Sequence, residues 1–263
     1  MASESEEDRA QTMNSPRYHW KSAEGEQVLQ LVYVRGTECR PFLFGERNAR
    51  LPIEIRGFFL ATVPVTQALW RQVMGPGGTS ACRSGDELPM ENVSWNAITG
   101  PSGFLHQINS SGITSVVAVQ IACADKVAFR LPTETEWEYA ARGGENWRDE
   151  FRFSGGNEIE RVAWFKDNRG DQTHEIVQKA PNQLGLYDMS GNVWEWCQDC
   201  YTEDVQRIPT DGSAFLGENP ERVLRGGCFH NWAIHCTVTK RYQIGRQFHD
   251  GCIGFRIALS EAG

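Results

Sequence analysis

The sequence lacks the apolar and basic segments that would attach a protein to a membrane or to a nucleic acid. No part of the 263-residue chain contains the run of roughly 18 apolar residues that a membrane-spanning helix requires. Lysine and arginine never cluster beyond a pair, and the net charge is -8 at pH 7. Phosphate contacts would need the opposite balance of charge. We therefore predict neither insertion into a membrane nor a nucleic-acid partner.

The N-terminal segment also lacks the apolar core of a signal peptide. Residues 1–15 contain no apolar stretch, and residues 1–27 as a whole are acidic and polar. We therefore predict a solvated leader or tether over residues 1–27 and one domain over residues 28–263. The composition of the chain, with 40% hydrophobic residues and 26 glycines, is typical of a globular, loop-rich protein. Removal of an export signal would leave the same start, so the compartment stays open.

The eight cysteines lack the spacing of a disulfide scaffold. We expect most of them to be free thiols. Cys197 and Cys200 form a lone CxxC motif, without the second Cys or His pair that tetrahedral zinc needs. No βαβ pattern surrounds the motif, so thioredoxin-like chemistry is not favoured either.

Local patterns predict short strands and helices rather than long regular elements. β-branched and aromatic residues predict strands over residues 28–34, 53–60 and 113–121. Thr66 and Ser94 are suited to cap helices that begin at the next residue. From residue 144 onwards, short apolar pieces alternate with loops of roughly ten to twenty residues, and loops of this length are usually functional.

The clearest helix signal covers residues 133–143. Thr133 and Glu136 have the spacing of a capping box, in which each side chain bonds to the backbone of the other residue. Gly143 supplies a stop for the helix. The apolar face of this helix consists of Trp137, Ala140 and Ala141.

The segment from Arg225 to Arg256 has the most unusual composition. Glycines at its two ends frame residues 228–252, which show neither helical nor strand periodicity. Rigid amphipathic rings are typical of binding surfaces, because they give contact area at low entropic cost. The rings in this frame are Phe229, His230, Trp232, His235, Tyr242, Phe248 and His249.

An irregular core loop with buried aromatics is the alternative interpretation of this segment. Part of the segment does alternate as buried anchors would. We assign four residues to packing on this ground: Ala233, Cys236, Val238 and Ile253.

Three motifs occur in a fixed order along the chain: RLPTETEWEYAARGG (130–144), GLYDMSGNVWEW (185–196) and RVLRGG with IGFR (222–256). Together with VTQALWRQVMG (65–75) and ENVSWNA (91–97), they resemble the sulfatase-modifying, formylglycine-generating enzyme superfamily, over about residues 28–259. The resemblance implies an α+β protein with the C-type lectin fold of the formylglycine-generating-enzyme type. That fold would comprise two main helices, small mixed sheets and many ordered loops.

The same resemblance allows an enzymatic function. Formylglycine-generating enzymes bind copper through two cysteines, five residues apart, just after the double glycine. Here these positions fall on Asn231 and Cys236. Because Cu(I) is held by soft sulfur donors, the missing thiolate argues against the same copper site, and Cys228 is displaced by three residues. A copper- or iron-dependent oxidase that uses Cys236 is the alternative function.

Histidines could also be combined with cysteines into a separate metal site. No pair among them has the spacing that fixes ligands before folding, so we expect scattered surface side chains instead. The residues concerned are His230, His235 and His249, with Cys228, Cys236 and Cys252.

The variable proteins of diversity-generating retroelements form another branch of the superfamily. The sequence resembles this branch without lacking any residue that the resemblance requires. The resemblance implies a hypervariable segment between RVLRGG and IGFR, in which Ala233, Cys236 and Arg241 stand at matching positions. It also implies mutation at template adenines, which would produce most residue types found here but not Trp232, a fixed aromatic platform in this interpretation. The ligand-binding residues would be Cys228, Phe229, His230, Trp232, Ile234, His235, Tyr242, Ile244, Gly245, Phe248, His249, Gly251 and Cys252.

The GLYDMSGNVWEW motif carries a possible metal site. The resemblance implies structural calcium, held by the Glu195 carboxylate and by backbone carbonyls near Gly191 and Val193 as hard oxygen ligands. Alternatively, Glu195 is a buried acid that is satisfied by backbone N–H groups or by an arginine. The sequence leaves both possibilities open.

From these observations we expect a non-enzymatic display protein that binds varied protein ligands, or other macromolecules, through residues 228–252. We expect a monomer that requires no cofactor apart from the possible calcium. The resemblance further implies a lipoprotein at the cell surface.

Overall fold

The computed structural model describes residues 16–21, 27–38, 40–46, 49–76, 81–120, 127–168 and 170–261. The strands are β1 (Arg17–Lys21), β2 (Gln27–Val34), β3 (Phe42–Phe44), β4 (Leu51–Ile53), β5 (Phe58–Ala61), β6 (Val127–Arg130), β7 (Trp194–Cys200), β8 (Glu221–Arg225), β9 (Arg241–Gly245), β10 (Ile253–Gly254) and β11 (Ala258–Glu261). The helices are α2 (Gln67–Met74), α3 (Trp95–Thr99), α4 (Phe104–Ser110), α5 (Gly112–Gln120), α6 (Glu134–Ala141) and α7 (Ile159–Val162), with short 3-10 helices at η1 (Gly144–Asp149), η2 (Val205–Arg207) and η3 (Ala233–His235).

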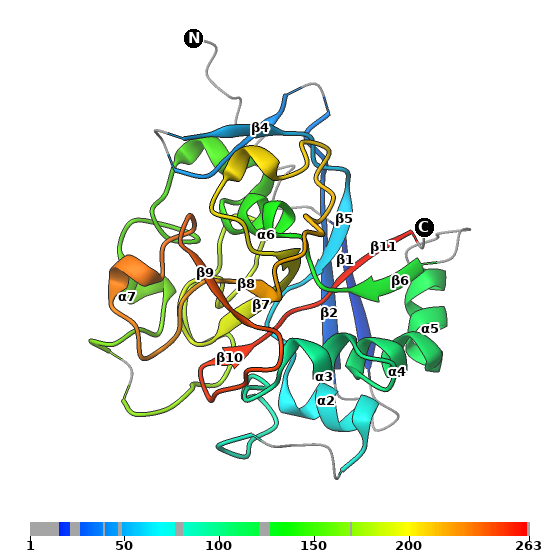
Figure 1. Cartoon of the computed structure of the whole chain (residues 1–263). Helices are drawn as coiled ribbons and strands as arrows, with labels where there is room; N and C mark the ends of the chain where they lie inside the picture. Colours follow the sequence, from blue (N-terminus) through cyan, green and yellow to red (C-terminus); the bar gives the residue numbers. More distant parts are fainter. Residues whose placement is uncertain are drawn as a thin grey trace.

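Two sheets organise the molecule. An antiparallel five-stranded sheet has the order β1-β2-β5-β11-β6. A four-stranded sheet has the order β10-β7-β8-β9 and is mixed, because β10 runs parallel to β7 while the other pairs are antiparallel. Figure 1 shows the two sheets side by side, with helices α2 to α4 gathered at one end. Small mixed sheets with many loops and short helices confirm the predicted α+β fold.

Helix α6 connects the two halves of the core. Its side chains are buried along the whole helix, and it packs against β7 and β8 on one side and β3 on another. Trp137 is fully buried there, among residues of both sheets. The predicted capping box is confirmed: Thr133 Oγ1 accepts from the Glu136 N–H, and Glu136 Oε2 accepts from the Thr133 N–H. Thr66 and Ser94 cap α2 and α3 as predicted, because their side chains accept from the N–H groups of Leu69 and Ala97.

The prediction of a strand over residues 113–121 is wrong, because residues 112–120 form α5. Ile113 and Val117 are both buried and lie one turn apart, while Val116 between them is 46% exposed. Ser111 Oγ accepts from the Ile113 N–H at the start of this helix. Packing of one face against α4 and β6 thus overrides the β propensity of the sequence. Ile121 itself lies outside the described residues.

The predicted strand over residues 53–60 is divided into two strands, β4 and β5. Residues 54 and 55 bond elsewhere: the Glu54 N–H donates to Thr210 O, and Ile55 O accepts from the Thr37 N–H. Gly57 then lies against the ring of Tyr33, where a Cβ atom would collide with the hydroxyl group. The chain leaves the hairpin with β3 and joins the five-stranded sheet at this point.

The start of the domain also differs from the prediction, which assigned residues 1–27 to a solvated leader. Residues 17–21 form β1, an edge strand of the five-stranded sheet that pairs antiparallel with β2. Basic and aromatic residues alternate in this short stretch. This pattern is compatible with an edge strand, which is hydrogen-bonded to a neighbour on one side only. Residues 1–15 lie outside the described part of the chain.

Candidate functional site

The segment of residues 228–252 begins at a turn that only glycine accommodates. Gly226 and Gly227 follow β8 directly and have φ angles of 93° and 75°. A Cβ atom at Gly227 would lie 2.7 Å from His235 O and 2.8 Å from Cys236 Sγ. The double glycine therefore redirects the chain and brings the following loop back against itself.

Buried ion pairs anchor the two strands that flank the first loop of the segment. Arg225, at the end of β8, donates to Glu134 Oε1 and to Glu138 Oε2, each at 2.7 Å, and all three side chains are buried. Arg241, at the start of β9, donates to both oxygens of Glu134, at 2.6 and 2.7 Å. Helix α6 thus holds both ends of the 226–240 loop in fixed positions. The sequence analysis identified Arg241 only as a matching position between RVLRGG and IGFR and did not predict its ion pair.

The far end of the segment is fixed by a second buried ion pair. Arg256 donates from Nε to Glu195 Oε2 and from Nη2 to Glu195 Oε1, both at 2.7 Å. The indole N–H of Trp137 donates to the same Oε2 at 2.7 Å. Glu195 lies in β7 and Arg256 follows β10, so the pair joins neighbouring parts of the mixed sheet.

This arrangement does not fit the calcium site implied by the resemblance. Both oxygens of Glu195 are already held by the guanidinium of Arg256, whose positive charge would repel a second cation. Gly191 directs its N–H to Gly226 O and packs against the backbone of Trp164. Val193 is fully buried. Glu195 is instead a buried acid satisfied by an arginine, the alternative that the sequence left open.

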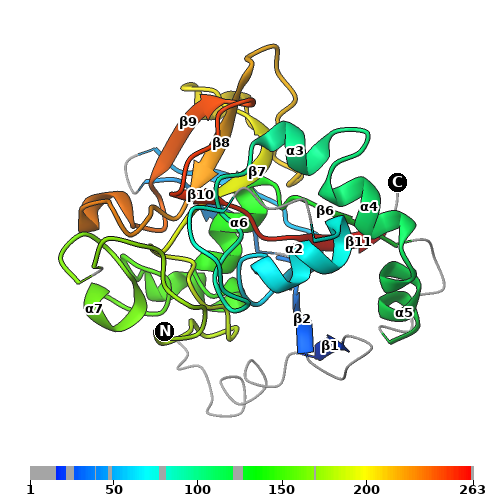
Figure 2. The same ribbon diagram turned by 90° about the horizontal axis from the view of Figure 1, so that it is seen from below.

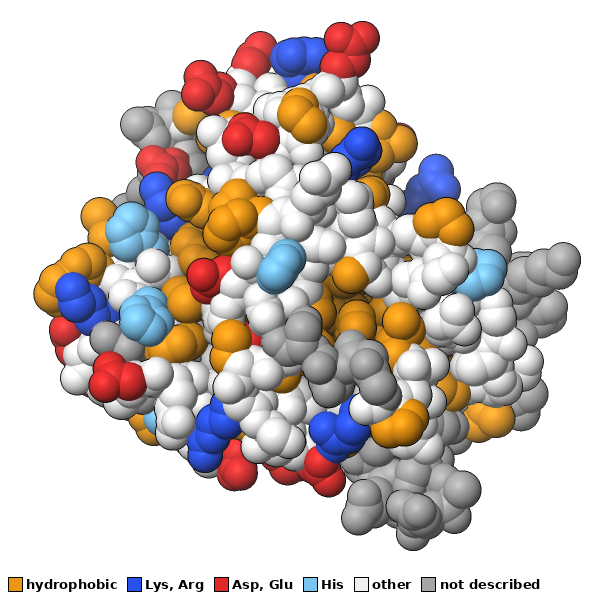
Figure 3. Space-filling view, turned by 60° about the horizontal axis from the view of Figure 1, so that its bottom comes forward, with side chains coloured by type: hydrophobic (Ala, Val, Ile, Leu, Met, Phe, Trp, Pro, Cys, Tyr) orange, Lys and Arg blue, Asp and Glu red, His pale blue; other side chains and the backbone are white. Residues whose placement is uncertain are grey.

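Most large side chains of the segment point outwards. Four of its hydrophobic residues are among the large exposed ones of the described chain: Trp232 at 53%, Ile234 at 60%, Tyr242 at 48% and Phe248 at 46%. His230 and His249 are exposed as well, whereas His235, Ile244, Gly245, Gly251 and Cys252 are half-buried. Figures 1 and 2 show β9 on the side of the molecule away from β1 and β2, and Figure 3 shows hydrophobic and histidine side chains distributed over one face.

Two predicted contact residues are buried instead. Cys228 is 1% exposed and Phe229 is 5% exposed, and both belong to a core cluster that includes Trp194 and Ile253. The Phe229 N–H donates to Asn192 O at 3.0 Å, which draws the start of the segment towards β7. Of the residues assigned to packing, Cys236, Val238 and Ile253 are buried as predicted, and Ala233 is half-buried.

Residues from other parts of the chain support the exposed rings. Lys166 Nζ lies 3.7 Å from the ring centroid of Trp232, and Tyr242 stacks on Trp194 at 5.4 Å. His249 Nδ1 lies 2.8 Å from Asn92 Oδ1. Sequence patterns did not predict these supports, because Lys166, Trp194 and Asn92 lie far from their partners along the chain. The contacts restrict the rings, so that their surface is presented in a defined arrangement.

A pocket of about 460 Å³ opens between the two ends of the segment. Glu91, which is 1% exposed, accepts from the N–H of Cys82 at 2.6 Å, and burial raises the pKa of this carboxyl group. Six of the lining residues lie outside the 228–252 segment, and no sequence pattern predicted that they would border it. The pocket is lined by Cys82, Arg83, Glu91, Asp171, Gln172, Thr173, Phe229, His230, Asp250, Gly251 and Cys252.

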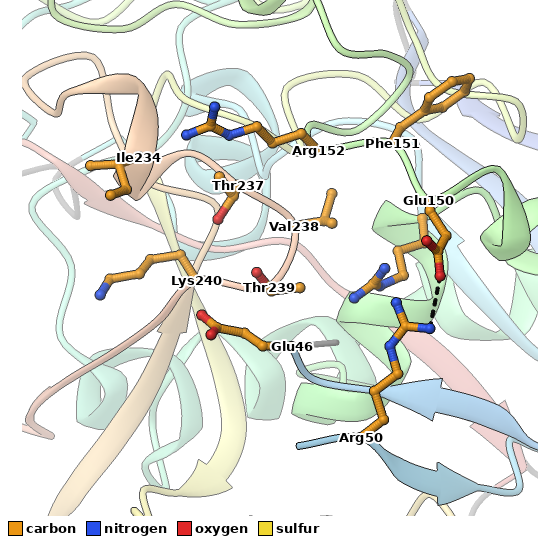
Figure 4. A pocket seen from close by; sticks show the side chains of 11 residues that line it. Glu46, Arg50, Glu150, Phe151, Arg152, Ile234, Thr237, Val238, Thr239 and Lys240 are labelled. Atoms are coloured by element: carbon orange, nitrogen blue, oxygen red, sulfur yellow. Dashed lines mark ion pairs between the residues drawn. The ribbon is translucent and has the colours of Figure 1, made fainter. Parts of the chain in front are cut away.

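A second pocket, of about 480 Å³, lies on the other side of η3. Figure 4 shows Ile234, Thr237 and Lys240 of the segment along one wall, opposite the ion pair of Arg50 with Glu150 at 2.8 Å. The side chain of Arg152 also borders this cavity. Charges of both signs line the pocket, which suits polar contacts with a partner more than enclosure of an apolar ligand.

The chemistry available to Cys236 is limited. Its side chain is fully buried, and burial, followed by the charge of Cys228, raises the pKa of its thiol to about 12. Asn231, at the position of the other copper ligand, accepts from the Cys228 N–H through its side chain. Among the described residues, no group of three or more His, Cys, Asp and Glu side chains could hold a metal ion. The six cysteines that the structure describes are free thiols.

No helix within the described ranges is long and apolar enough to span a membrane.

Comparison with known proteins identifies relatives of differing activity. The chain is 32% identical over 250 residues to the serine/threonine-protein kinase pkn1 of Chlamydia pneumoniae, covering 88% of this chain but only 38% of the kinase. It is 30% identical to the formylglycine-generating enzyme of Thermomonospora curvata over 69% of this chain and 56% of the enzyme. It is 37% identical to the inactive C-alpha-formylglycine-generating enzyme 2 of Mus musculus, over 75% of this chain and 56% of that protein.

Among solved structures, the Treponema denticola variable protein 1 shares the fold, with a TM-score of 0.70 and 24% identity over 92% of this chain and 98% of that one. The model of the sulfatase-modifying factor enzyme 1-like domain matches residues 22–261. This match covers every helix and strand of the described chain except β1, which ends at residue 21. The chain therefore belongs to the sulfatase-modifying factor enzyme 1-like family.

Proposed function

We propose that this chain is a non-enzymatic binding protein that presents residues 228–252 as a variable contact surface for protein ligands. The observation that carries the proposal is the contrast between the backbone and the side chains of this segment. The backbone is anchored by the buried arginines Arg225 and Arg256 and by the half-buried Arg241, each paired with a buried glutamate. Large side chains such as Trp232 and Tyr242 nevertheless remain about half exposed.

The chemistry of the surface favours a macromolecular ligand. Its exposed rings can act as anchors that become fully desolvated only against a large partner. The two neighbouring pockets, of about 460 and 480 Å³, are lined by mixed polar groups rather than by a closed apolar wall. The fold shared with the Treponema denticola variable protein 1 is compatible with this role.

Several features speak against the alternative of an oxidase. A buried thiol with a raised pKa is mostly protonated at neutral pH, whereas metal binding requires the thiolate. Asn231 offers an amide in place of the other thiolate. The family contains enzymes as well as a relative described as inactive, so membership alone does not decide the activity.

A display experiment tests the proposal. A library would be randomised at Trp232, Ile234, Tyr242 and Phe248, expressed on yeast and selected against several unrelated purified proteins. We expect most members to fold, and binders to emerge for at least some targets. A matched library randomised at the buried residues Cys236, Val238 and Ile253 should be largely misfolded. Equal loss of folding in both libraries would contradict the proposal.

A measurement of metal binding and turnover separates the two functions. The purified chain would be loaded with copper or iron and assayed for oxidation of a cysteine-containing peptide. We expect neither stoichiometric metal nor turnover. Activity that disappears in Cys236→Ser would establish the oxidase instead. The neighbouring DNA gives an independent test, because a variable protein requires a near-identical template repeat and a reverse transcriptase nearby.

We also propose that the protein acts as a monomer at the cell surface. The exposed rings of residues 228–252 would then be available to ligands outside the cell. Protease treatment of intact cells, followed by detection of residues 228–252, checks the location. Light scattering of the purified chain checks the oligomeric state.

A further inference from the structure

The pocket of about 480 Å³ beside η3 brings together basic side chains from separate parts of the chain. Figure 4 shows the side chains of Arg152, Thr237 and Lys240 along one side of this cavity. Thr237 and Lys240 belong to the 228–252 segment, whereas Arg152 comes from a loop outside it. The charged residues that line the pocket are Glu46, Arg50, Arg142, Glu150, Arg152 and Lys240.

Backbone hydrogen bonds fix the residues that carry the charges on this side. The Val238 N–H donates to Arg152 O at 3.0 Å, which holds Arg152 beside the segment. The Lys240 N–H donates to Thr237 O at 3.1 Å and closes a tight turn there. The guanidinium of Arg152 also lies over the ring of Phe153, 5.4 Å from its centroid. Arg152 and Lys240 are therefore positioned beside each other in the protein without a ligand.

These basic groups are not neutralised by the protein itself. Within the described ranges, neither Arg152 nor Lys240 forms an ion pair. Arg152 is exposed and Lys240 is half-buried, so a ligand can reach both. In the opposite wall, Arg50 pairs with Glu150 at 2.8 Å, but its Nε has no hydrogen-bond partner among the described residues. The pocket thus contains basic donors on both sides that lack acceptors.

A buried positive charge lies behind the pocket. Arg142, in the pocket wall, pairs with Glu138 at 2.9 Å, and Glu138 also pairs with Arg225. Glu134 pairs with both Arg225 and Arg241. Three arginines therefore share two glutamates, which leaves one positive charge in excess within this network of ion pairs. An anion in the pocket would lie next to Arg142 and would offset this excess, because solvent screens buried charges weakly.

We propose that this pocket binds a carboxylate of the protein ligand, carried by an aspartate or glutamate side chain, between Arg152 and Lys240. A guanidinium can donate two parallel N–H bonds to one carboxylate, and the Thr237 hydroxyl can donate a further bond. Glu46 and Glu150 disfavour a doubly charged phosphate more than a carboxylate with a single charge. This inference rests on the proposed function, because it names the chemical group that the contact surface recognises in its protein ligand.

The pocket is continuous with the exposed part of the contact surface. Ile234 lines the pocket and is 60% exposed. A ligand that covers Ile234 with an apolar side chain can therefore place an acidic side chain in the pocket at the same time. Interfaces usually have an apolar centre and a polar rim, and the pocket would belong to the rim.

The test measures the binding of hexaglutamate, labelled with an uncharged fluorophore, to the full chain by fluorescence anisotropy at low salt. Hexaglutamine with the same label is the control for peptide length. We expect hexaglutamate to bind with a Kd on the order of 0.1 mM and to be released as salt is added, and we expect no binding of hexaglutamine. The net charge of the chain is -8, so a general attraction between chain and peptide cannot explain such binding.

Variants assign the binding to the pocket. Arg152→Ala and Lys240→Ala should each weaken it about tenfold, because each removes a charge-assisted hydrogen bond. Thr237→Val should have a smaller effect. Arg246→Ala is the matched control and should leave the Kd unchanged, because it removes a positive charge from an exposed position of the same segment outside the pocket. These four positions are exposed or half-buried, so the melting temperatures should stay near that of the wild type.

Several results would overturn the proposal. They are equal losses in Arg246→Ala and in the pocket variants, equal binding of hexaglutamine, and displacement of the peptide by inorganic phosphate at lower concentrations than by free glutamate. Absence of hexaglutamate binding would also overturn it, although selection of binders from the display library would still support the proposed function. Binding of hexaglutamate that depends on Arg152 and Lys240, without any binder from the library, would support the carboxylate site and contradict the proposed function.

Discussion

Arg256 holds Glu195 in a fully buried, two-pronged ion pair, with both N–H···O distances at 2.7 Å. Trp137 adds a third hydrogen bond, so the pair joins three motifs that are far apart in the sequence: the IGFR motif, the GNVWEW strand and helix α6. Arg256 also donates to the backbone oxygens of Ala61 and Tyr187. One polar centre therefore fixes the end of the 228–252 segment to both sheets.

Removal of either partner of this pair should destabilise the protein strongly. We expect Glu195→Gln and Arg256→Met each to lower the free energy of unfolding by about 3 to 5 kcal/mol, because the remaining partner stays buried without compensation. Urea titration followed by fluorescence measures the effect. The exposed pair of Arg161 with Glu158 is the control, and its loss should change stability by less than about 0.5 kcal/mol. Similar effects for both pairs would refute the assigned role.

Calcium removal should leave the stability of this region unchanged. Both oxygens of Glu195 accept hydrogen bonds from Arg256 or Trp137, and the positive charge of Arg256 disfavours a second cation beside this carboxylate. We expect the same melting temperature in EGTA as in calcium. A lower value in EGTA that added calcium restores in wild type but not in Glu195→Gln would reinstate Glu195 as a ligand, since an ion that binds the folded state stabilises it.

Sequence patterns predicted those parts of the fold whose cause is local. The Thr133 and Glu136 capping box needs only a spacing of three residues, and it appears as expected. The φ angles of Gly226 and Gly227 likewise explain why the motif requires glycine. The motifs together predicted the fold, which periodicity alone would not have given, because long loops carry no repeating pattern.

Features that depend on distant contacts could not be predicted in this way. Residues 112–120 have high β propensity and yet form α5, because Ile113 and Val117 pack as one helical face. The wall of the pocket beside Cys252 includes Glu91 and Asp171, which no motif connects. Phe229 belongs to a segment whose composition predicts an exposed surface. Its N–H nevertheless donates to Asn192 O, and its side chain is buried in the core.

Asp199 should make stability fall with rising pH. It is buried, and burial together with the charge of Glu134 raises its pKa to about 7. This value lies above the unfolded value of about 3.9, so the folded state binds the proton more tightly. The stabilisation is complete below about pH 4 and is lost as the pH rises through about 7. Burial raises the pKa of Glu134, but the charges and hydrogen bonds of Arg241 and Arg225 together outweigh it and lower this pKa from its ordinary value.

We therefore expect the contribution of Asp199 to decline by an amount on the order of 4 kcal/mol between pH 4 and pH 8. Urea titrations at several pH values measure this dependence. Asp199→Asn should show a flatter profile, even if its stability is lower because the amide cannot accept from the N–H groups of both Glu134 and Phe215. An identical pH profile in this variant would rule out Asp199 as the titrating group.

Two phenylalanines of the same segment give a matched test of which side chains are displayed. Phe248 is 46% exposed, so Phe248→Ala should lower the free energy of unfolding by less than about 1 kcal/mol. Phe229 is 5% exposed and packs in the core, so Phe229→Ala should cost about 3 to 5 kcal/mol, as should Trp137→Ala. Chemical denaturation of the three variants measures these differences.

Because the substitutions at Phe229 and Phe248 remove the same atoms from one loop, any difference between them reports their surroundings. A cost above about 3 kcal/mol for Phe248→Ala would mean that this part of the segment packs rather than displays, and the proposed contact surface would lose one of its anchors.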